Sequence, residues 1–158
     1  MFWVGAGSQG ESSLASRSFP VLVVTGETSG EQHAAGLIGQ IEHQNPEWEV
    51  QWFGSGGPQM AAAGVDLLED VSQLAAVGPW EALSQMGVYW RAYRRILSEV
   101  ERRRPKLAIL VDFPEFNLKL ARRLKKMEVP VCYFIGPQIW AWRPGRIKQI
   151  QRWVDLML

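Results

Sequence analysis

The sequence predicts an α/β fold built on a parallel β-sheet. From residue 20 onward, short apolar runs rich in β-branched residues alternate with amphipathic segments, a pattern typical of strands joined by helical crossovers. The clearest strand, Val21–Val24, is apolar throughout, as expected for a strand buried on both faces of a sheet. The 158 residues, 47% hydrophobic and 21% charged, suit one globular domain of ordinary size.

The elements follow from these signals in chain order. After Val21–Val24, a turn leads into a helix from about Gly30 to Gln44, where Ser29 followed by Gln32 fits a capping box. A later, longer helix is predicted over Pro79–Arg104, and Pro105 limits its extension. The remaining predicted elements are strand Glu49–Phe53, a short helix after Pro58, strand Val65–Leu68, helix Pro79–Arg104, strand Leu107–Val111, helix Glu115–Met127, strand Val131–Ile135, helix Pro144–Trp153 and strand Val154–Leu158.

The two ends of the chain carry separate expectations. Residues 1–18 are rich in Ser and Gly and are interpreted as a disordered leader, so the domain is expected to span 19–158. The chain stops inside the apolar run Val154–Leu158, which we interpret as truncation before a further domain. An edge strand that closes the sheet is the alternative.

Composition excludes several functional classes. A net charge of +1 gives no bulk attraction to nucleic acid. The single cysteine, Cys132, lies in an apolar run, which argues against a disulfide scaffold and fits a reducing compartment. His33 and His43 have no cysteine or carboxylate beside them at metal-ligand spacing, so no metal site is predicted. No apolar run approaches the ~20 residues that cross a bilayer.

Chemistry is expected just after the strands, because ligands of open parallel sheets bind beyond the carboxyl ends of the strands. The first such segment, Thr25–Glu31, has glycines that allow close backbone approach and a helix start that offers free N–H groups to an anion. The second, Gly54–Pro58, is a flexible loop; Gln59 replaces the third glycine of a dinucleotide fingerprint. Either segment is also explained by a simple turn.

Two further segments stand out. Asp112 follows the strand Leu107–Val111, where a carboxylate is costly unless it is hydrogen-bonded or used, and it is a candidate general base. The alternative is that Asp112 caps the next helix. Gly136–Arg146 combines two tryptophans with arginines, which suits stacking on a ring or binding a phosphate, or else packing of the loop on the domain.

These four segments resemble, in order, motifs of the lipid-A-disaccharide synthase family. The family's Gly-Glu-x-Ser-Gly-Asp-x-His resembles Gly26–His33, and its Gly-Gly-Pro-x-Met matches Gly56–Met60. The third motif, Asp-x-Pro-x-Phe-Asn, matches Asp112, Pro114, Phe116 and Asn117. The fourth, Ser-Pro-x-x-Trp-Ala-Trp, resembles Gly136–Trp142. Glu31 replaces the usual Asp of the first motif, and Gly136 replaces the usual Ser of the fourth.

The resemblance implies a fold and a reaction. The fold is GT-B, with two Rossmann-like domains, of which this chain would be the N-terminal, acceptor-side one without the C-terminal, donor-binding domain. The reaction is inverting transfer of diacylglucosamine from UDP to diacylglucosamine 1-phosphate, which gives a β-1,6-linked disaccharide phosphate and UDP, with no cofactor or metal. Asp112 would be the general base. The residues expected to line the cleft are Glu27, Ser29, Gly30, Gly56, Gly57 and Asn117.

Two other functional classes stay open at this point. One is a standalone nucleotide-binding module without transferase activity. The other is a non-catalytic structural or partner-binding fragment of a decayed or split gene.

Because the implied substrates are lipids, we also expect contact with a membrane surface. Trp80 and Trp90 lie on one broad stripe of the helix predicted over Pro79–Arg104, and Arg91 and Arg94 lie beside them. Tryptophan favours the headgroup boundary and arginine can meet lipid phosphates there. The alternative is that this stripe packs on the sheet. The expected location is the cytoplasm, on the inner face of the inner membrane.

Overall fold

A computed structural model describes residues 17–70, 82–135 and 145–158. Its core is one six-stranded sheet in the order β3-β2-β1-β4-β5-β6, and every neighbouring pair of strands is parallel. The predicted parallel sheet is therefore confirmed, and the apolar runs expected inside it at Val21–Val24, Leu107–Val111 and Val131–Ile135 fall in β1, β4 and β5 or end one residue after β5. The strands are β1 (Arg17–Thr25), β2 (Trp48–Gly56), β3 (Asp66–Asp70), β4 (Leu107–Val111), β5 (Val131–Phe134) and β6 (Leu156–Met157). The helices are α1 (Thr28–Gln44), α2 (Pro58–Ala62), α3 (Ala82–Arg103), α4 (Pro114–Lys126) and α6 (Gly145–Trp153).

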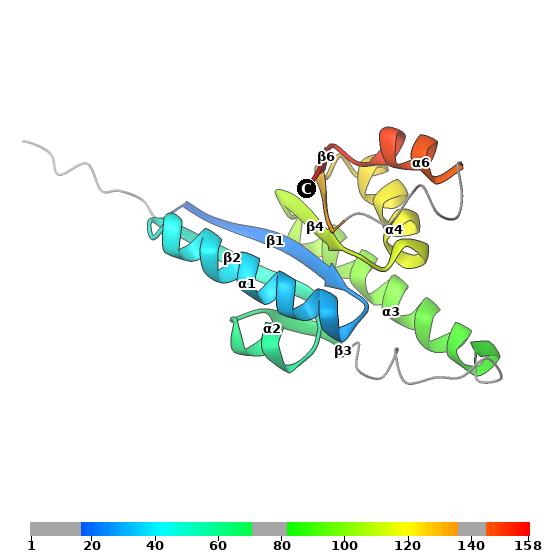
Figure 1. The fold of residues 1–158 in the computed structure, drawn as a ribbon, viewed down its shortest axis with the longest axis horizontal. Coiled ribbons are helices and arrows are strands. Elements are labelled where there is room, and N and C mark those ends of the chain that lie inside the picture. The colour runs from blue at the N-terminus through cyan, green and yellow to red at the C-terminus, as the bar shows by residue number, and fades with distance from the viewer. Residues whose placement is uncertain (1–16, 71–81, 136–144) are drawn as a thin grey trace, which may run out of the picture.

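Helices cover both faces of the sheet (Figure 1). On one face, the buried core joins α1 and α2 to the strands through residues such as Ala34, Ile38 and Met60. On the other, α3, α4 and α6 pack on the same strands through Ile96, Leu120 and other apolar residues. The sheet is thus the middle of three layers.

The central strand β1 is covered on both faces, which explains the all-apolar run Val21–Val24. Val21 and Val23 belong to the core on the α1 side, whereas Leu22 and Val24 belong to the core on the α3 side. All four are at most 2% exposed. Alternate side chains of a strand point to opposite faces, so a strand covered on both sides must be apolar at every position.

Some boundaries differ from those predicted. β1 begins at Arg17, because Arg17 and Ser18 continue the pairing with β2, so the sheet reaches two residues into the expected leader. α1 begins at Thr28 with Glu27 at the N-cap and no side-chain capping bond, so the predicted capping box at Ser29 is wrong. Residues 1–16, Trp80 and the stretch 136–144 lie outside the described residues.

Candidate functional site

The motifs gather at the carboxyl ends of the strands, where the strand order reverses. From β1 the chain moves to β2 on one side, and β4 later pairs with the other side of β1. Such a switch point is where open α/β sheets bind ligands. The segments after β1, β2 and β4 (26–30, 57–60 and 112–117) therefore lie at the same end of the strands. We call this region the switch-point crevice, after the place where sheets of this kind bind ligands. The tryptophan-rich segment beginning at Gly136 lies outside the described residues.

Gly26, just after β1, touches the turn after β4. A Cβ atom at Gly26 would lie 2.1 Å from Cδ1 of Phe113, closer than any side chain tolerates. Only glycine lets the Phe113 ring approach the backbone this closely. The first and third motifs are therefore in direct contact at the switch-point crevice.

Glu31 joins the first motif to the second. Its side chain is buried, and Oε1 accepts hydrogen bonds from the backbone N–H groups of Gln59 at 2.6 Å and Met60 at 3.3 Å. These N–H groups belong to the first turn of α2, where a helix lacks i−4 acceptors, and that of Met60 also donates to the carbonyl oxygen of Gly57 at 3.1 Å. A Cβ atom at Gly57 would lie 2.7 Å from Oε2 of Glu31. The glutamate that replaces the family's aspartate thus caps α2 instead of facing an open cleft.

The remaining residues expected along the cleft differ in exposure. Glu27 and Ser29 are exposed at the start of α1, whereas Gly30 is buried against Val111 and Thr25. Gly56 and Gly57 are buried as well. The buried glycines shape the backbone, while Glu27 and Ser29 are accessible to a ligand.

Asp112 lies at the start of a strained turn after β4. Asp112 has φ 48° and Phe113 has φ 50°, both in the left-handed region that residues with a Cβ atom rarely adopt. Asp112 is half-buried. The N-cap of α4 is Phe113 and no side chain caps it, so the alternative that Asp112 is simply a helix cap is wrong. Strain of this kind clusters at functional sites.

Asn117 lies beneath this turn. It is 0% exposed, and its Nδ2 donates to the carbonyl oxygens of Val111 at 3.2 Å and Asp112 at 2.8 Å. Its Oδ1 is buried without a hydrogen-bond partner among the described residues. Asn117 was expected to line the cleft, but full burial directs its amide to the backbone under Asp112 instead.

Tyr89 on α3 is a site residue that sequence reasoning missed. Its ring lies 5.5 Å from that of Phe113 and 5.3 Å from that of Phe116. Burial, then the negative charges of Glu115 and Glu27, raise the pKa of Tyr89 to about 12. The hydroxyl is therefore a neutral hydrogen-bonding group close to both acids. Only its place in an amphipathic helix marked it in the sequence.

The outer face of α3 carries three of the residues expected to meet a membrane, Trp90, Arg91 and Arg94. Trp90 is 53% exposed, and with Gly87, Arg91 and Arg94 it lines a shallow hollow of about 540 Å³. One edge of the Trp90 ring contacts Tyr93, with centroids 5.6 Å apart. In the described part of the chain, no helix is long and apolar enough to cross a membrane.

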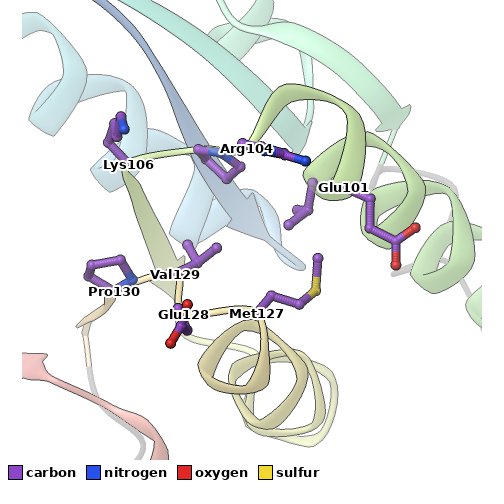
Figure 2. Close-up of a pocket in the computed structure, with 9 residues that line it drawn as sticks. Glu101, Arg104, Lys106, Met127, Glu128, Val129 and Pro130 are labelled. Atoms are coloured by element: carbon purple, nitrogen blue, oxygen red, sulfur yellow. The ribbon is translucent and has the colours of Figure 1, made fainter.

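A second hollow, of about 650 Å³, lies at the opposite end of the strands, beside the starts of β4 and β5 (Figure 2). It forms where α3 and α4 end. Arg104, directly after α3, and Glu128, after the C-cap Met127 of α4, have positive φ, as is usual at helix C-termini. Met127 and Val129 also line it. The residues that line this hollow include none from the motifs after β1, β2 and β4.

The crevice offers one half-buried carboxylate and a set of hydrogen-bonding groups. Within residues 17–70, 82–135 and 145–158, no three His, Cys, Asp or Glu side chains gather as a metal site requires. Acid–base chemistry at a ligand hydroxyl is open to Asp112, because this residue follows β4 directly and is only half-buried.

Known proteins resemble the chain over most of its length. A family model described as lipid-A-disaccharide synthetase matches residues 21–158. The lipid-A-disaccharide synthases of Nitrosococcus oceani and Geobacter sulfurreducens are 47% and 44% identical to it over 137 and 140 residues. These matches cover 87% and 89% of this chain but 35% and 36% of the relatives, so the chain spans about a third of their length.

A solved structure supports the fold. UDP-GlcNAc 2-epimerase from Neisseria meningitidis, bound to UDP-GlcNAc, matches with a TM-score of 0.51 at 8% identity. The match covers 87% of this chain and 39% of the epimerase chain. At this identity the likeness concerns the α/β fold alone.

Proposed function

This chain belongs to the lipid-A-disaccharide synthetase family, and from that premise we propose that it is the acceptor-side domain of a lipid A glycosyltransferase. The whole enzyme would transfer diacylglucosamine from UDP to diacylglucosamine 1-phosphate. The observation that carries the proposal is the position of Asp112, half-buried in a strained turn at the switch-point crevice.

In the proposed reaction, Asp112 is the general base. Its carboxylate takes the proton of the acceptor's 6-hydroxyl while that oxygen bonds to the anomeric carbon of the donor sugar. The bond from the anomeric carbon to the UDP oxygen breaks on the opposite face, which inverts the configuration. UDP leaves with the bonding electron pair, and the product is the β-1,6-linked disaccharide phosphate.

The acceptor would be held by groups around Asp112. Glu27 and Ser29 are exposed at the start of α1 and can hydrogen-bond sugar hydroxyls. The buried Gly30, Gly56 and Gly57 would keep the backbone close to the ligand. Tyr89 would add a neutral hydroxyl that can hydrogen-bond the ligand. The UDP part of the donor would bind mainly to a second, C-terminal domain of the same fold.

We further propose that α3 docks on the membrane that holds the lipid substrates. Exposed Trp90 beside Arg91 and Arg94 supports this, because an indole ring favours the headgroup boundary and guanidinium groups bind phosphates. Trp80 would extend the same stripe. The site would be the inner face of the inner membrane, reached from the cytoplasm.

A hybrid enzyme tests the proposed function. Residues 21–158 would replace the matching segment of the Nitrosococcus oceani synthase, and UDP release would be measured with and without diacylglucosamine 1-phosphate. Acceptor-dependent release, with formation of the disaccharide phosphate, is expected. A folded hybrid that binds the UDP-sugar but makes no disaccharide would contradict the proposal and favour a non-catalytic binding module.

A further inference from the structure

We propose that Tyr133 and Asn117 are positioning residues that clamp the backbone of Asp112 and so aim its carboxylate into the switch-point crevice. The clamp itself is a statement about the turn after β4. Its consequence for turnover rests on the proposed function, in which Asp112 is the general base.

Two side chains converge on one carbonyl group. The carbonyl oxygen of Asp112 accepts a hydrogen bond from the hydroxyl of Tyr133 at 2.5 Å and from Nδ2 of Asn117 at 2.8 Å. Tyr133 comes from β5, the strand next to β4, and Asn117 comes from the first turns of α4. Both lone pairs of this carbonyl are therefore used, by donors from two different elements.

Both donors are themselves fixed in place. Tyr133 and Asn117 are each 0% exposed, so neither side chain can change rotamer without disturbing the core. The backbone N–H of Asp112 donates to the carbonyl oxygen of Phe134 at 3.2 Å, which ties the same residue to β5 a second time. Asp112 is thus held at both its backbone N–H and its carbonyl group.

The conformation held in this way is one that the local sequence does not favour. Asparagine, aspartate and glycine tolerate the left-handed region, but phenylalanine does not, and Phe113 has φ 50° directly after Asp112 at φ 48°. A turn of this kind persists only when its surroundings over-determine it. The clamp below the turn and the contact of Phe113 with Gly26 above it meet that requirement.

Packing alone does not explain Asn117. Its Oδ1 is buried without a hydrogen-bond partner among the described residues, which an apolar side chain of similar size would avoid. The amide group is useful there because its two N–H groups reach the successive carbonyls of Val111 and Asp112. The residue suits holding the end of β4 better than filling the core.

The first arm of the test measures the turn in the 158-residue chain itself by NMR. In Tyr133→Phe, scalar couplings should show Phe113 sampling negative φ, and the Asp112 amide should exchange with solvent about ten-fold faster. The Cys132 amide in the middle of β5 should keep its protection. The matched control is Tyr93→Phe, which removes another tyrosine hydroxyl bonded to a backbone carbonyl, that of Lys119. Unchanged couplings and exchange in Tyr133→Phe would overturn the clamp.

The second arm measures turnover in the hybrid enzyme. Tyr133→Phe should lower kcat about ten-fold with KM within about two-fold, because a misplaced base slows chemistry more than it weakens binding. Tyr93→Phe should leave both constants unchanged. An unchanged kcat in Tyr133→Phe would overturn the positioning role. If Asp112→Asn also leaves kcat unchanged, the proposed base is wrong, while the NMR arm still decides whether the clamp exists.

Discussion

Single contacts between distant motifs build the switch-point crevice. Gly26 makes room for Phe113, and Gly57 makes room for the carboxylate of Glu31. The sequence identified these residues as turn glycines with a possible ligand role. It could not identify their partners, because each contact joins segments far apart in the chain and no local pattern encodes it.

The role of Asp112 is tested by Asp112→Asn in the hybrid enzyme. Asparagine keeps the size of the side chain but cannot take a proton, so kcat should fall by about 100-fold or more, the usual scale of general-base loss. Acceptor affinity, measured by calorimetry, should change much less. Glu128→Gln, an exposed substitution at the opposite end of the strands, is the control. Turnover close to wild type in Asp112→Asn would exclude the base.

Glu31→Ala should destabilise the fold through α2. It removes the acceptor of the Gln59 N–H and one of the two acceptors of the Met60 N–H, and loss of such a cap costs about 0.5–2 kcal/mol. Glu31→Gln keeps an oxygen at the same place and should cost less. Urea unfolding of the three proteins measures the difference in the free energy of unfolding. Equal stability of Glu31→Ala and wild type would remove the capping role.

At the scale of elements, the sequence predicted interiors better than ends. β4 was predicted at the observed bounds, Leu107–Val111, because an apolar run between Lys106 and Asp112 leaves little choice. The start of α1 was missed, because the capping-box pattern at Ser29 is only one of several ways to begin a helix. The polar start of β1, at Arg17 and Ser18, is set by pairing with β2 and has no local signal.

The edge of the sheet at β6 should weaken in acid. A hydrogen bond from Lys125, then one from the Val131 backbone N–H at 2.9 Å, lowers the pKa of Asp155. A carboxylate with a lowered folded pKa stabilises the fold above its unfolded pKa, about 3.9, and that contribution is lost as pH falls through the folded value.

Amide exchange at Val131, followed while the pH is lowered through 4 toward 2, measures this loss. Asp155→Asn keeps an oxygen for the Val131 N–H but removes the charge. In this variant, the protection of the Val131 amide from exchange should vary less with pH. Identical pH profiles for the two proteins would show that Asp155 contributes no acid sensitivity.

Membrane docking by α3 is tested with lipid vesicles. Replacing Trp80 and Trp90 together by serine should weaken co-sedimentation with anionic vesicles, because the indole rings no longer enter the headgroup layer. Trp48→Ser is the matched control, since Trp48 is exposed as well, at 40%, but lies on β2. Equal binding of vesicles by the double variant and the wild type, with both folded, would contradict the membrane proposal.

For the whole molecule, alternation of apolar and amphipathic segments was sufficient to predict the layered α/β fold. The order of the strands was not predicted, because parallel pairing depends on contacts across the whole chain. The site was predicted in part: Asp112 was singled out by its place after a strand, but Tyr89 and Tyr133 resembled ordinary helix and strand residues.

The isolated chain is expected not to turn over UDP-sugar. It spans about a third of the length of its relatives, and the donor nucleotide is proposed to bind elsewhere in the whole enzyme. UDP release from the purified 158-residue protein, with donor and lipid acceptor present, should match the no-enzyme blank, while the hybrid enzyme is active. Acceptor-dependent release by the chain alone would contradict the proposed division of labour.

The pairing of β1 with β4 also affects how the protein folds while it is being synthesised on the ribosome. β1 is made early and finds β2 soon afterwards, but its other edge pairs with β4, whose register joins Val21 to Leu107. Until Val111 has been synthesised, the central strand β1, with its apolar run Val21–Val24, keeps one edge unpaired. Open strand edges recruit other chains. The nascent chain is therefore most exposed to aggregation while α3 is being made, and chaperones would be needed most during that interval.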